Sequence, residues 1–457
     1  MKQAIRGVAA RSVQLPDPYT PGHGSAHWTA LHYDLDLDYR LASNRLAARA
    51  VVTGRAAGAA SQLLRTIELD LVGLKVTKVS LRGGRILRFS ARGSRLVVTP
   101  SAPISGSQEF TLEIRYSGNP TPTRSTWGEV GWEELTDGVL VAGQPTGGPS
   151  WFPCNDHPSQ KATYRMAVTT DTNYRAICNG QLVSHTPKAS RGTWVYDQPE
   201  PMATYLATVQ IGRYQLDRSG AGLVPQFSAA PVGLRDATRR ALVRQPEMMS
   251  AFADLFGPYP FETYTVVVAD DVLEIPLEAQ SLSILGRNHL GSDWESQRLI
   301  AHELSHQWFG NSLTIDSWRD IWLHEGFACY AEWLWSEKSG ALSSAQRATE
   351  AWRLLAAEPQ DLAIGDPGAA DMFDDRVYKR GALALHALRA ATGDHLFFAV
   401  LREWTTRFRH GSVSTADLID LAQELCGGVR GFDAAALLEP WLYQTALPNL
   451  PPPRPVS

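Results

Sequence analysis

One short stretch, residues 299 to 332, limits what this chain can fold into more than any other. It reads LIAHELSHQWFGNSLTIDSWRDIWLHEGFACYAE and places His302 and His306 four residues apart. Four residues make just over one helical turn, so both imidazoles project from one face of a helix. Glu303 lies between them, and a second carboxylate, Glu325, follows His306 after eighteen intervening residues. The stretch therefore predicts two helices that bring these four side chains together.

The residue types in this stretch indicate a zinc site. Two neutral imidazoles and one carboxylate are ligands that zinc prefers, and three protein ligands leave a fourth position open for water. An open position distinguishes a catalytic zinc from a structural one. The H-E-x-x-H pattern also supplies a glutamate that is not a ligand and can reach the metal-bound water. We therefore expect one Zn²⁺ per chain, held by His302, His306 and Glu325, with Glu303 as the general base.

A five-residue match also occurs on ordinary amphipathic helices, where the two histidines would form a solvated polar face. The surroundings argue against that reading. Ser292 to Glu295 reads as a capping box with Ser292 as N-cap, which starts a helix about two turns before His302. The flanking residues are mostly apolar, so the helix is expected to be buried, and two unpartnered histidines there would be costly. Glu332, two turns after Glu325, is expected to orient a ligand histidine.

Length and composition set the wider limits. The chain has 457 residues, more than one hydrophobic core usually serves, so two or three domains are expected. A net charge of -4 gives no excess of basic residues that would attract nucleic acid or an anionic membrane. Four scattered cysteines without a C-x-x-C pair favour reduced thiols. No signal-peptide core and no stretch of ~20 apolar residues is present, so the expected location is the cytoplasm.

Hydrophobic periodicity separates a strand-rich half from a helix-rich half. From about residue 27 to 215, apolar and polar residues alternate between turns rich in glycine, serine and proline, which is typical of half-buried strands. This half reads as a large antiparallel β domain. Its expected strands include residues 32–39, 67–71, 96–99, 110–116 and, as the last one, 203–211.

The period becomes helical after a segment with glycine and proline near 219–233. Pro246 is expected to break or kink the run 234–256, and residues 264–269 are expected to form a strand. From Asp293 onward the chain reads as mainly helical, and Ser414 to Asp417 is expected to cap another helix. The expected division is an N-terminal extension (1–26), the β domain (27–215), a catalytic domain (216–450) and a disordered tail (451–457).

Together these motifs resemble those of the zinc aminopeptidases related to aminopeptidase N and leukotriene A4 hydrolase, peptidase family M1. The resemblance covers most of the chain. It implies an α+β multidomain fold: a saddle-like antiparallel β domain, then a mainly helical, thermolysin-like (gluzincin) domain, in a short form without the C-terminal helical domain of larger members. The segments that carry it are HQWFGNSLT, WRDIWLHEGFA, PSWFPCNDHPSQKATY (149–164), PMATYLATVQIGRY (201–214), FGPYPF (256–261) and VYKRGALALHALR (377–389).

The resemblance implies further roles. His302, His306 and Glu325 match the family's zinc ligands and Glu303 its base, in agreement with the reading above. Tyr378, in a Y-x-x-G segment, matches the tyrosine that stabilises the oxyanion.

Two further residues match substrate-binding positions. Glu278 matches the glutamate of the G-x-M-E-N loop, which binds the substrate's free amine. Gln144 matches a glutamine that lines the first side-chain pocket. The loop itself departs from the family pattern, because Pro276 removes a backbone N–H and Ala279 replaces an amide side chain. His324 replaces the usual asparagine beside the glutamate ligand, and we expect it to be a neighbour rather than a fourth ligand.

The implied reaction is zinc-dependent release of one residue at a time from the N-terminus of a peptide. Three alternatives stay open: an open-cleft endopeptidase, an epoxide hydrolase as in one branch of the family, and a binding scaffold with a dead site. Glu278 argues against the first and the intact ligand set against the last. The expected partners are peptides with a free N-terminus, with no nucleic acid and no membrane. A homo-oligomer stays open, since a second subunit could cover the cleft.

Overall fold

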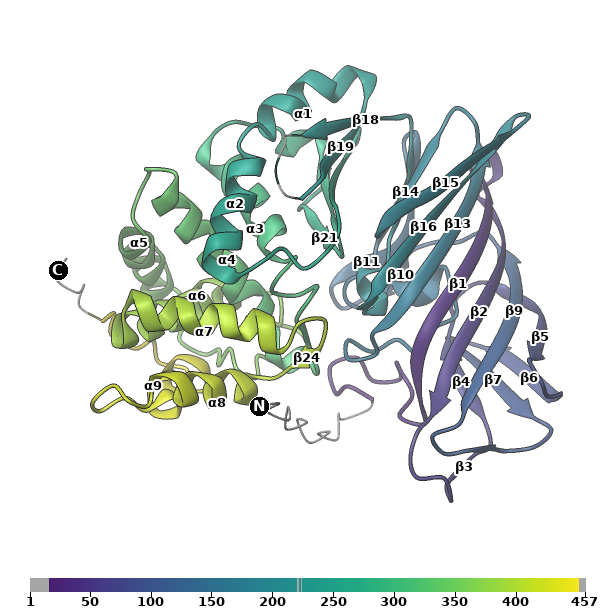
Figure 1. Cartoon of the computed structure of the whole chain (residues 1–457), viewed down its shortest axis with the longest axis horizontal. Helices are drawn as coiled ribbons and strands as arrows, with labels where there is room; N and C mark the ends of the chain where they lie inside the picture. Colours follow the sequence, from purple (N-terminus) through teal and green to yellow (C-terminus); the bar gives the residue numbers. More distant parts are fainter. Residues whose placement is uncertain (1–15, 220–221, 223, 452–457) are drawn as a thin grey trace, which may run out of the picture.

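The structure is a computed structural model that describes residues 16–219, 222 and 224–451. A strand-rich half and a helix-rich half lie side by side (Figure 1). The expected tail falls almost wholly outside the described residues, as do residues 1–15 of the expected N-terminal extension. None of the helices in the described ranges is both long and apolar enough to cross a membrane.

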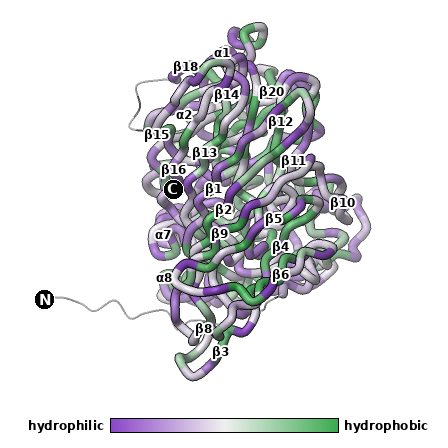
Figure 2. The backbone as a smooth tube through the Cα atoms, turned by 90° about the vertical axis from the view of Figure 1, so that its right-hand side faces the viewer, coloured by the Kyte–Doolittle hydropathy of each residue, from purple (hydrophilic) through white to green (hydrophobic). Residues whose placement is uncertain are grey.

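The largest sheet of the β half has seven strands in the order β15-β16-β13-β1-β2-β9-β5. Along β1, Tyr33, Leu35 and Leu37 are buried and the residues between them are not, which confirms the expected alternation. Figure 2 shows hydrophobic and hydrophilic residues interleaved along the strands of this half. The strands are β1 (Trp28–Arg40), β2 (Arg45–Ala56), β5 (Lys75–Leu81), β9 (Glu109–Gly118), β13 (Ala162–Asp171), β15 (Gln181–Lys188) and β16 (Arg191–Met202).

One pair in this sheet is parallel, which differs from the antiparallel pairing expected for this domain. β1 and β13 run in the same direction, with His32 opposite Thr163. Alternation along a strand sets which face is buried but carries no information about the direction of a distant neighbour. The other pairs of the sheet are antiparallel.

Smaller sheets complete the β half. One has the order β10-β11-β12-β17-β14, another β4-β7-β6, and β3 pairs with β8. Their bounds are β3 (Leu63–Leu64), β4 (Ile67–Asp70), β6 (Ile86–Arg92), β7 (Arg95–Pro100), β8 (Ile104–Ser105), β10 (Thr123–Ser125), β11 (Gly128–Leu135), β12 (Gly138–Ala142), β14 (Arg175–Cys178) and β17 (Val209–Gly212).

The expected last strand, 203–211, is only partly a strand. Thr204–Leu206 forms a 3-10 turn, and β17 begins at Val209. The side chain of Asn179 takes the place of a strand partner there: its Nδ2 donates to Leu206 O (2.8 Å) and its Oδ1 accepts from Thr208 N–H (2.7 Å). A buried backbone needs hydrogen-bond partners but not a second strand.

The helical half contains a five-stranded sheet of order β18-β19-β20-β22-β21. The expected boundary at residues 215 and 216 falls inside β18, and the expected strand at 264–269 is β20. The bounds are β18 (Tyr214–Ser219), β19 (Gln226–Pro231), β20 (Tyr264–Ala269), β21 (Leu277–Ala279) and β22 (Leu282–Gly286). A short parallel pair joins β23 (Thr314–Ile315) to β24 (Ser412–Val413).

Helices make up most of the remaining chain, as expected. Pro246 lies in the first turn of α2, so the helical run breaks just before it. Asp417 accepts from Ser414 N–H (2.9 Å) at the start of α8, as expected. The helices are α1 (Arg235–Ala241), α2 (Gln245–Phe256), α3 (Trp294–Ser305), α4 (Trp322–Lys338), α5 (Ser344–Ala357), α6 (Asp375–Thr392), α7 (Asp394–Arg407), α8 (Thr415–Cys426) and α9 (Ala434–Leu442).

The cap of α3 differs from the expectation by one residue. Asp293, not Ser292, is the N-cap, and its carboxylate accepts from Ser296 N–H at 2.9 Å. Asp and Ser are both good N-caps, so spacing alone does not choose between neighbours. The helix still begins two turns before His302.

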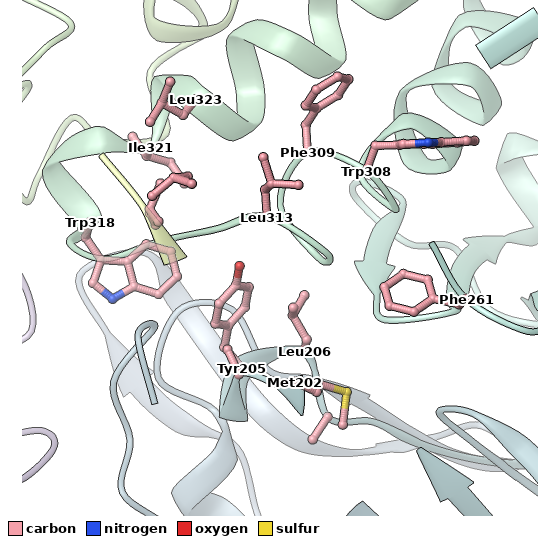
Figure 3. Packing of buried hydrophobic residues seen from close by; sticks show 14 of the residues in the cluster. Met202, Tyr205, Leu206, Phe261, Trp308, Phe309, Leu313, Trp318, Ile321 and Leu323 are labelled. Carbon is pink, nitrogen blue, oxygen red and sulfur yellow. The ribbon is translucent and has the colours of Figure 1, made fainter. Parts of the chain in front are cut away.

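The two halves share one hydrophobic core. At their junction, Tyr205 and Leu206 of the β half point toward Leu313 and Trp318 of the helical half (Figure 3). The rings of Tyr205 and Trp318 lie 5.0 Å apart between centroids. Trp318 belongs to the turn that leads directly into α4, so the β half packs against the segment that positions Glu325.

Candidate metal centre and cleft

Helices α3 and α4 bring three potential metal ligands together. His302 and His306 lie at the C-terminal end of α3, and Glu325 lies in the first turn of α4. All three side chains are buried, and one ligand atom from each lies within 4.8 Å of the others. Glu325 Oε2 is 3.4 Å from His302 Nε2 and 3.6 Å from His306 Nε2. The pattern of two histidines four apart therefore forms the cluster that the sequence predicts.

The outer nitrogens of both rings have protein partners. His302 Nδ1 lies 2.8 Å from Glu332 Oε1, and His306 Nδ1 lies 3.0 Å from the carbonyl oxygen of Phe309. Because both partners are acceptors, each Nδ1 donates a proton, which leaves each Nε2 as the ring atom that faces Glu325. Two imidazole nitrogens and a carboxylate that converge in a buried space form a donor set that fits a metal ion.

The protonation states of these groups also favour a cation. Burial lowers the pKa of His306 to about 4, so this imidazole is neutral. Although burial opposes it, the two histidines hold the pKa of Glu325 below its usual value. Burial also opposes a charge on His302, but contacts with Glu325 and Glu332 raise its pKa. The site thus attracts positive charge, which a metal ion provides as well as a proton does.

Glu303 lies on α3 beside the ligand histidines and faces the same cleft. Its side chain is buried, and Oε2 has no hydrogen-bond partner among the described residues. Burial raises its pKa to about 7, with His302 opposing the shift and Glu325 adding to it. A carboxyl group that titrates near neutral pH with one free oxygen is suited to accept and return a proton.

Tyr378 and Glu278 reach the cleft from two other elements. The ring of Tyr378, in the first turn of α6, lies nearly parallel to that of His302, with centroids 6.1 Å apart. Burial, followed by the charges of Glu325 and Glu278, raises the pKa of Tyr378, so its hydroxyl stays a donor. Glu278 is the middle residue of β21, and burial together with Glu325 and Glu303 raises its pKa well above the usual range.

These residues line one cleft of about 1290 Å³ that both halves of the molecule form. Gln144, two residues after the end of β12, contributes from the β half, and its Nε2 has no hydrogen-bond partner among the described residues. The structure therefore brings all the predicted site residues to one place, while their chemical roles stay predictions. The lining includes Gln144, Glu278, His302, Glu303, His306, Glu325, Glu332 and Tyr378.

His324 does not belong to the group of potential metal ligands found among the described residues. Its Nε2 accepts from Ile315 N–H at 3.0 Å, and burial lowers its pKa to about 3. This nitrogen is therefore already used, whereas Nδ1 has no hydrogen-bond partner among the described residues; that His324 is a neighbour and not a ligand stays a prediction.

Sequence reasoning missed some residues of the cleft. Arg298 lies one turn before His302 on α3 and contacts the carboxylate of Glu332 at 3.4 Å. Its spacing of four residues from His302 could have predicted that both side chains lie on the same face of the helix. Trp127 of the β half donates from Nε1 to Ala369 O (2.7 Å) and packs edge-on against Phe373. No local pattern signals such a contact, since it joins segments about 240 residues apart.

Family comparisons match both halves of the chain. Residues 29–206 match the peptidase M1 N-terminal domain, and residues 240–441 match the peptidase family M1 domain. Leucyl aminopeptidase of Saccharolobus solfataricus is 26% identical over 406 residues, which are 84% of this chain and 50% of that protein. The chain spans about half the length of the curated relatives it matches.

Solved structures match along their whole length. A mutant of an M1 zinc metallopeptidase from Deinococcus radiodurans, bound to a Tyr-Ser-Ala substrate, has a TM-score of 0.87 and 29% identity. The match covers 97% of this chain and 100% of that one. A two-domain M1 zinc metallopeptidase mutant bound to L-tryptophan has a TM-score of 0.85 and 30% identity with the same coverage.

Proposed function

Because the chain belongs to peptidase family M1, we propose that it is a zinc-dependent aminopeptidase that removes residues from the N-terminus of peptides. The observation that carries this proposal is the position of Glu278. It lies in the same cleft as the His302, His306 and Glu325 cluster, where a carboxylate can bind an amine beside the metal.

The cofactor is one zinc ion, which His302, His306 and Glu325 would hold. Bound zinc lowers the pKa of a water molecule to about 7 and polarises a carbonyl. Glu332 keeps His302 in the tautomer that leaves Nε2 free for the metal, and Phe309 O does the same for His306.

The protein side chains move the protons. Glu303 accepts a proton from the attacking water through its unpartnered oxygen and later gives it to the departing amine. The Tyr378 hydroxyl donates to the oxygen that becomes negative in the transition state, a contribution of about 10²–10³ in rate for one donor. Its raised pKa keeps the proton on that hydroxyl at neutral pH.

Glu278 provides the selectivity for the chain end. Burial and two neighbouring carboxylates raise the pKa of Glu278. A cationic partner therefore stabilises the charged form of this side chain strongly. The α-ammonium of a peptide is such a partner, and pairing with it places the first peptide bond over Glu303 and the metal ligands. We propose that Gln144 lines the pocket for the first side chain, where its free Nε2 donates to substrate.

We also propose the cytoplasm as the location. The four cysteines (Cys154, Cys178, Cys329 and Cys426) are buried and free, which supports a reducing compartment. The proposed partners are peptides with an unblocked N-terminus.

A mass-spectrometric time course on short peptides, each with a free and an acetylated N-terminus, tests the function. We expect stepwise loss of residues from free N-termini alone, which stops with a zinc chelator and returns with added zinc. Internal cuts, or equal cleavage of acetylated peptides, would establish an endopeptidase instead. A protein that holds zinc and cleaves none of the peptides would contradict the enzymatic assignment.

A further inference from the structure

Two buried amides connect the metal-binding helix to the strand that carries Glu278. Gln307 directly follows the ligand His306, and Asn311 lies in the turn after it. Both side chains have 0% exposure. Gln307 Nε2 donates to Ala279 O at 3.1 Å, and Asn311 Nδ2 donates to the same oxygen at 2.9 Å. Ala279 is the residue next to Glu278, so two donors converge on the carbonyl beside the proposed amine anchor.

Gln307 also holds the turn that follows this carbonyl. Its Oε1 accepts from Ser281 N–H at 2.8 Å, so one side chain contacts the backbone on both sides of the hairpin between β21 and β22. Ser281 has a φ of 63°, a left-handed conformation that is unfavourable for a residue other than glycine. The bond from its N–H to Gln307 is well placed to maintain this strained turn.

The strand is held by its pairing with β22 and by few side chains of its own. β21 is only three residues long and lies at the edge of its sheet, with β22 as its single neighbour. Pro276 precedes it and cannot donate a backbone hydrogen bond, and Ala279 has no polar side chain. The two amides therefore add hydrogen bonds beside Glu278 to the pairing with β22 and to the bond that Asn179 Nδ2 donates to Gln280 O.

The other end of the connection is equally fixed. Asn311 N–H donates to the carbonyl oxygen of the ligand His306 at 2.9 Å. Lys161 of the β half donates from Nζ to Asn311 O at 3.0 Å and to Ser312 O at 2.7 Å. The turn with Asn311 is thus tied to a metal ligand, to the β half and to the strand of the amine anchor.

We propose that Gln307 and Asn311 are positioning residues that set the separation between the metal ligands and Glu278, and so determine that the first peptide bond is cleaved. This inference rests on the proposed function of Glu278. A displacement of about 1 Å in a positioned group can cost 10²-fold in rate. Ordinary core amides would stabilise the fold without affecting recognition of the amine.

The test uses Gln307→Met and Asn311→Leu, which keep side-chain volume and remove the donors. Gln245→Met is the control, since Gln245 is also fully buried in the helical half but pairs with Gln226, away from the cleft. Each variant is made in full-length, zinc-loaded protein. A second set carries Glu303→Ala, so that binding can be measured without turnover.

Calorimetric Kd values for a free and an N-acetylated Tyr-Ser-Ala tripeptide give the decisive readout in the Glu303→Ala set. We expect Gln307→Met and Asn311→Leu to weaken binding of the free peptide at least tenfold and to change that of the acetylated peptide less than twofold. Zinc content should be unchanged. The Gln245→Met control should bind both peptides as the parent does, even where its thermal midpoint falls.

Equal weakening for both tripeptides, or unchanged binding of the free one in folded, zinc-loaded Asn311→Leu, would overturn the positioning role. Asn311→Leu removes a single bond to Ala279 O, so it decides the question if Gln307→Met does not fold. A parent protein that binds and cleaves both tripeptides equally would overturn the proposed function itself, and that result is visible before any variant is made.

Discussion

His302 Nδ1 lies 2.8 Å from a carboxylate oxygen of Glu332, which stands two turns after Glu325 on the same helix. Helix α4 therefore supplies both a metal ligand and the group that orients another ligand on α3. A carboxylate behind a ligand histidine fixes the ring and increases the basicity of the nitrogen that faces the metal. The two-turn spacing is what allows one rigid element to do both.

Glu332→Gln should weaken zinc binding about 10–100-fold, because an amide orients the imidazole without strengthening its basicity. Competition with a chelator of known affinity measures this. Glu295→Gln is the control, since Glu295 contacts Arg298 and is largely exposed at 71%. Equal zinc affinity in wild type and Glu332→Gln would remove the orienting role from Glu332.

Glu303→Ala should keep zinc bound and lose turnover. The side chain contributes no ligand atom to the cluster, but its free oxygen is the proposed proton acceptor. Loss of a general base typically costs 10²–10⁴-fold in kcat. Metal analysis and kcat on the same preparation test both halves of this prediction; residual activity within tenfold of wild type would assign the base elsewhere.

Tyr378→Phe should lower kcat about 10²–10³-fold with little change in KM, because the hydroxyl acts on charge that develops in the transition state. The phenyl ring can keep its packing against His302, so the metal site should stay intact. Steady-state kinetics with a zinc assay measures the effect. A rise in KM alone would show that the hydroxyl binds the ground state.

Glu278→Ala should harm substrates with a free amine far more than blocked ones. The anchor carboxylate is lost, while the metal ligands and Glu303 are unchanged. The ratio of kcat/KM for free and acetylated versions of one peptide is the measurement. If both values fell by the same factor, Glu278 would support the site without binding the amine.

The metal ligands could be predicted because their geometry is local. His302 and His306 share one helix, and helical spacing alone puts them on one face. Residue type and spacing added Glu325, and the resemblance to the family then predicted roles for Tyr378 and Glu278 on other elements. The strands of the β half were also predictable from period-two alternation, which depends only on which face of each strand is buried.

Features that depend on contacts between distant segments could not be predicted. The parallel pairing of β1 with β13 depends on the path of the chain between them. Gln307 and Asn311 lie in a predicted motif, but their bonds to Ala279 require the tertiary position of the β21 hairpin. Residues 203–208 leave the strand pattern, and the distant side chain of Asn179 bonds two of their backbone groups, Leu206 O and Thr208 N–H.

A buried charge network in the β half predicts an effect of pH on stability. Asp70 is 1% exposed, accepts from Gly24 N–H and Asp156 N–H, and pairs with Arg95 at 2.8 Å. Burial, followed by the charge of Asp156, raises its pKa from 3.8 to about 6, with Arg95 opposing the shift. The pKa of His23, which contacts Asp156, is also raised, although burial opposes it.

Asp70 should therefore make the fold less stable as pH rises from about 4 to 6. In this window the folded state holds the Asp70 proton and the unfolded chain has released it, so stability falls with pH; a shift of this size corresponds to on the order of 3 kcal/mol. The measurement is the difference in thermal midpoint between the zinc-loaded wild type and zinc-loaded Asp70→Asn at each pH. Because both proteins bind the same metal, its own pH dependence cancels in this difference. The wild type should lose several degrees relative to the variant between pH 4 and 7. A constant difference would show that Arg95 compensates the burial of the carboxylate fully, and the opposite trend would show that the folded state lowers the pKa of Asp70.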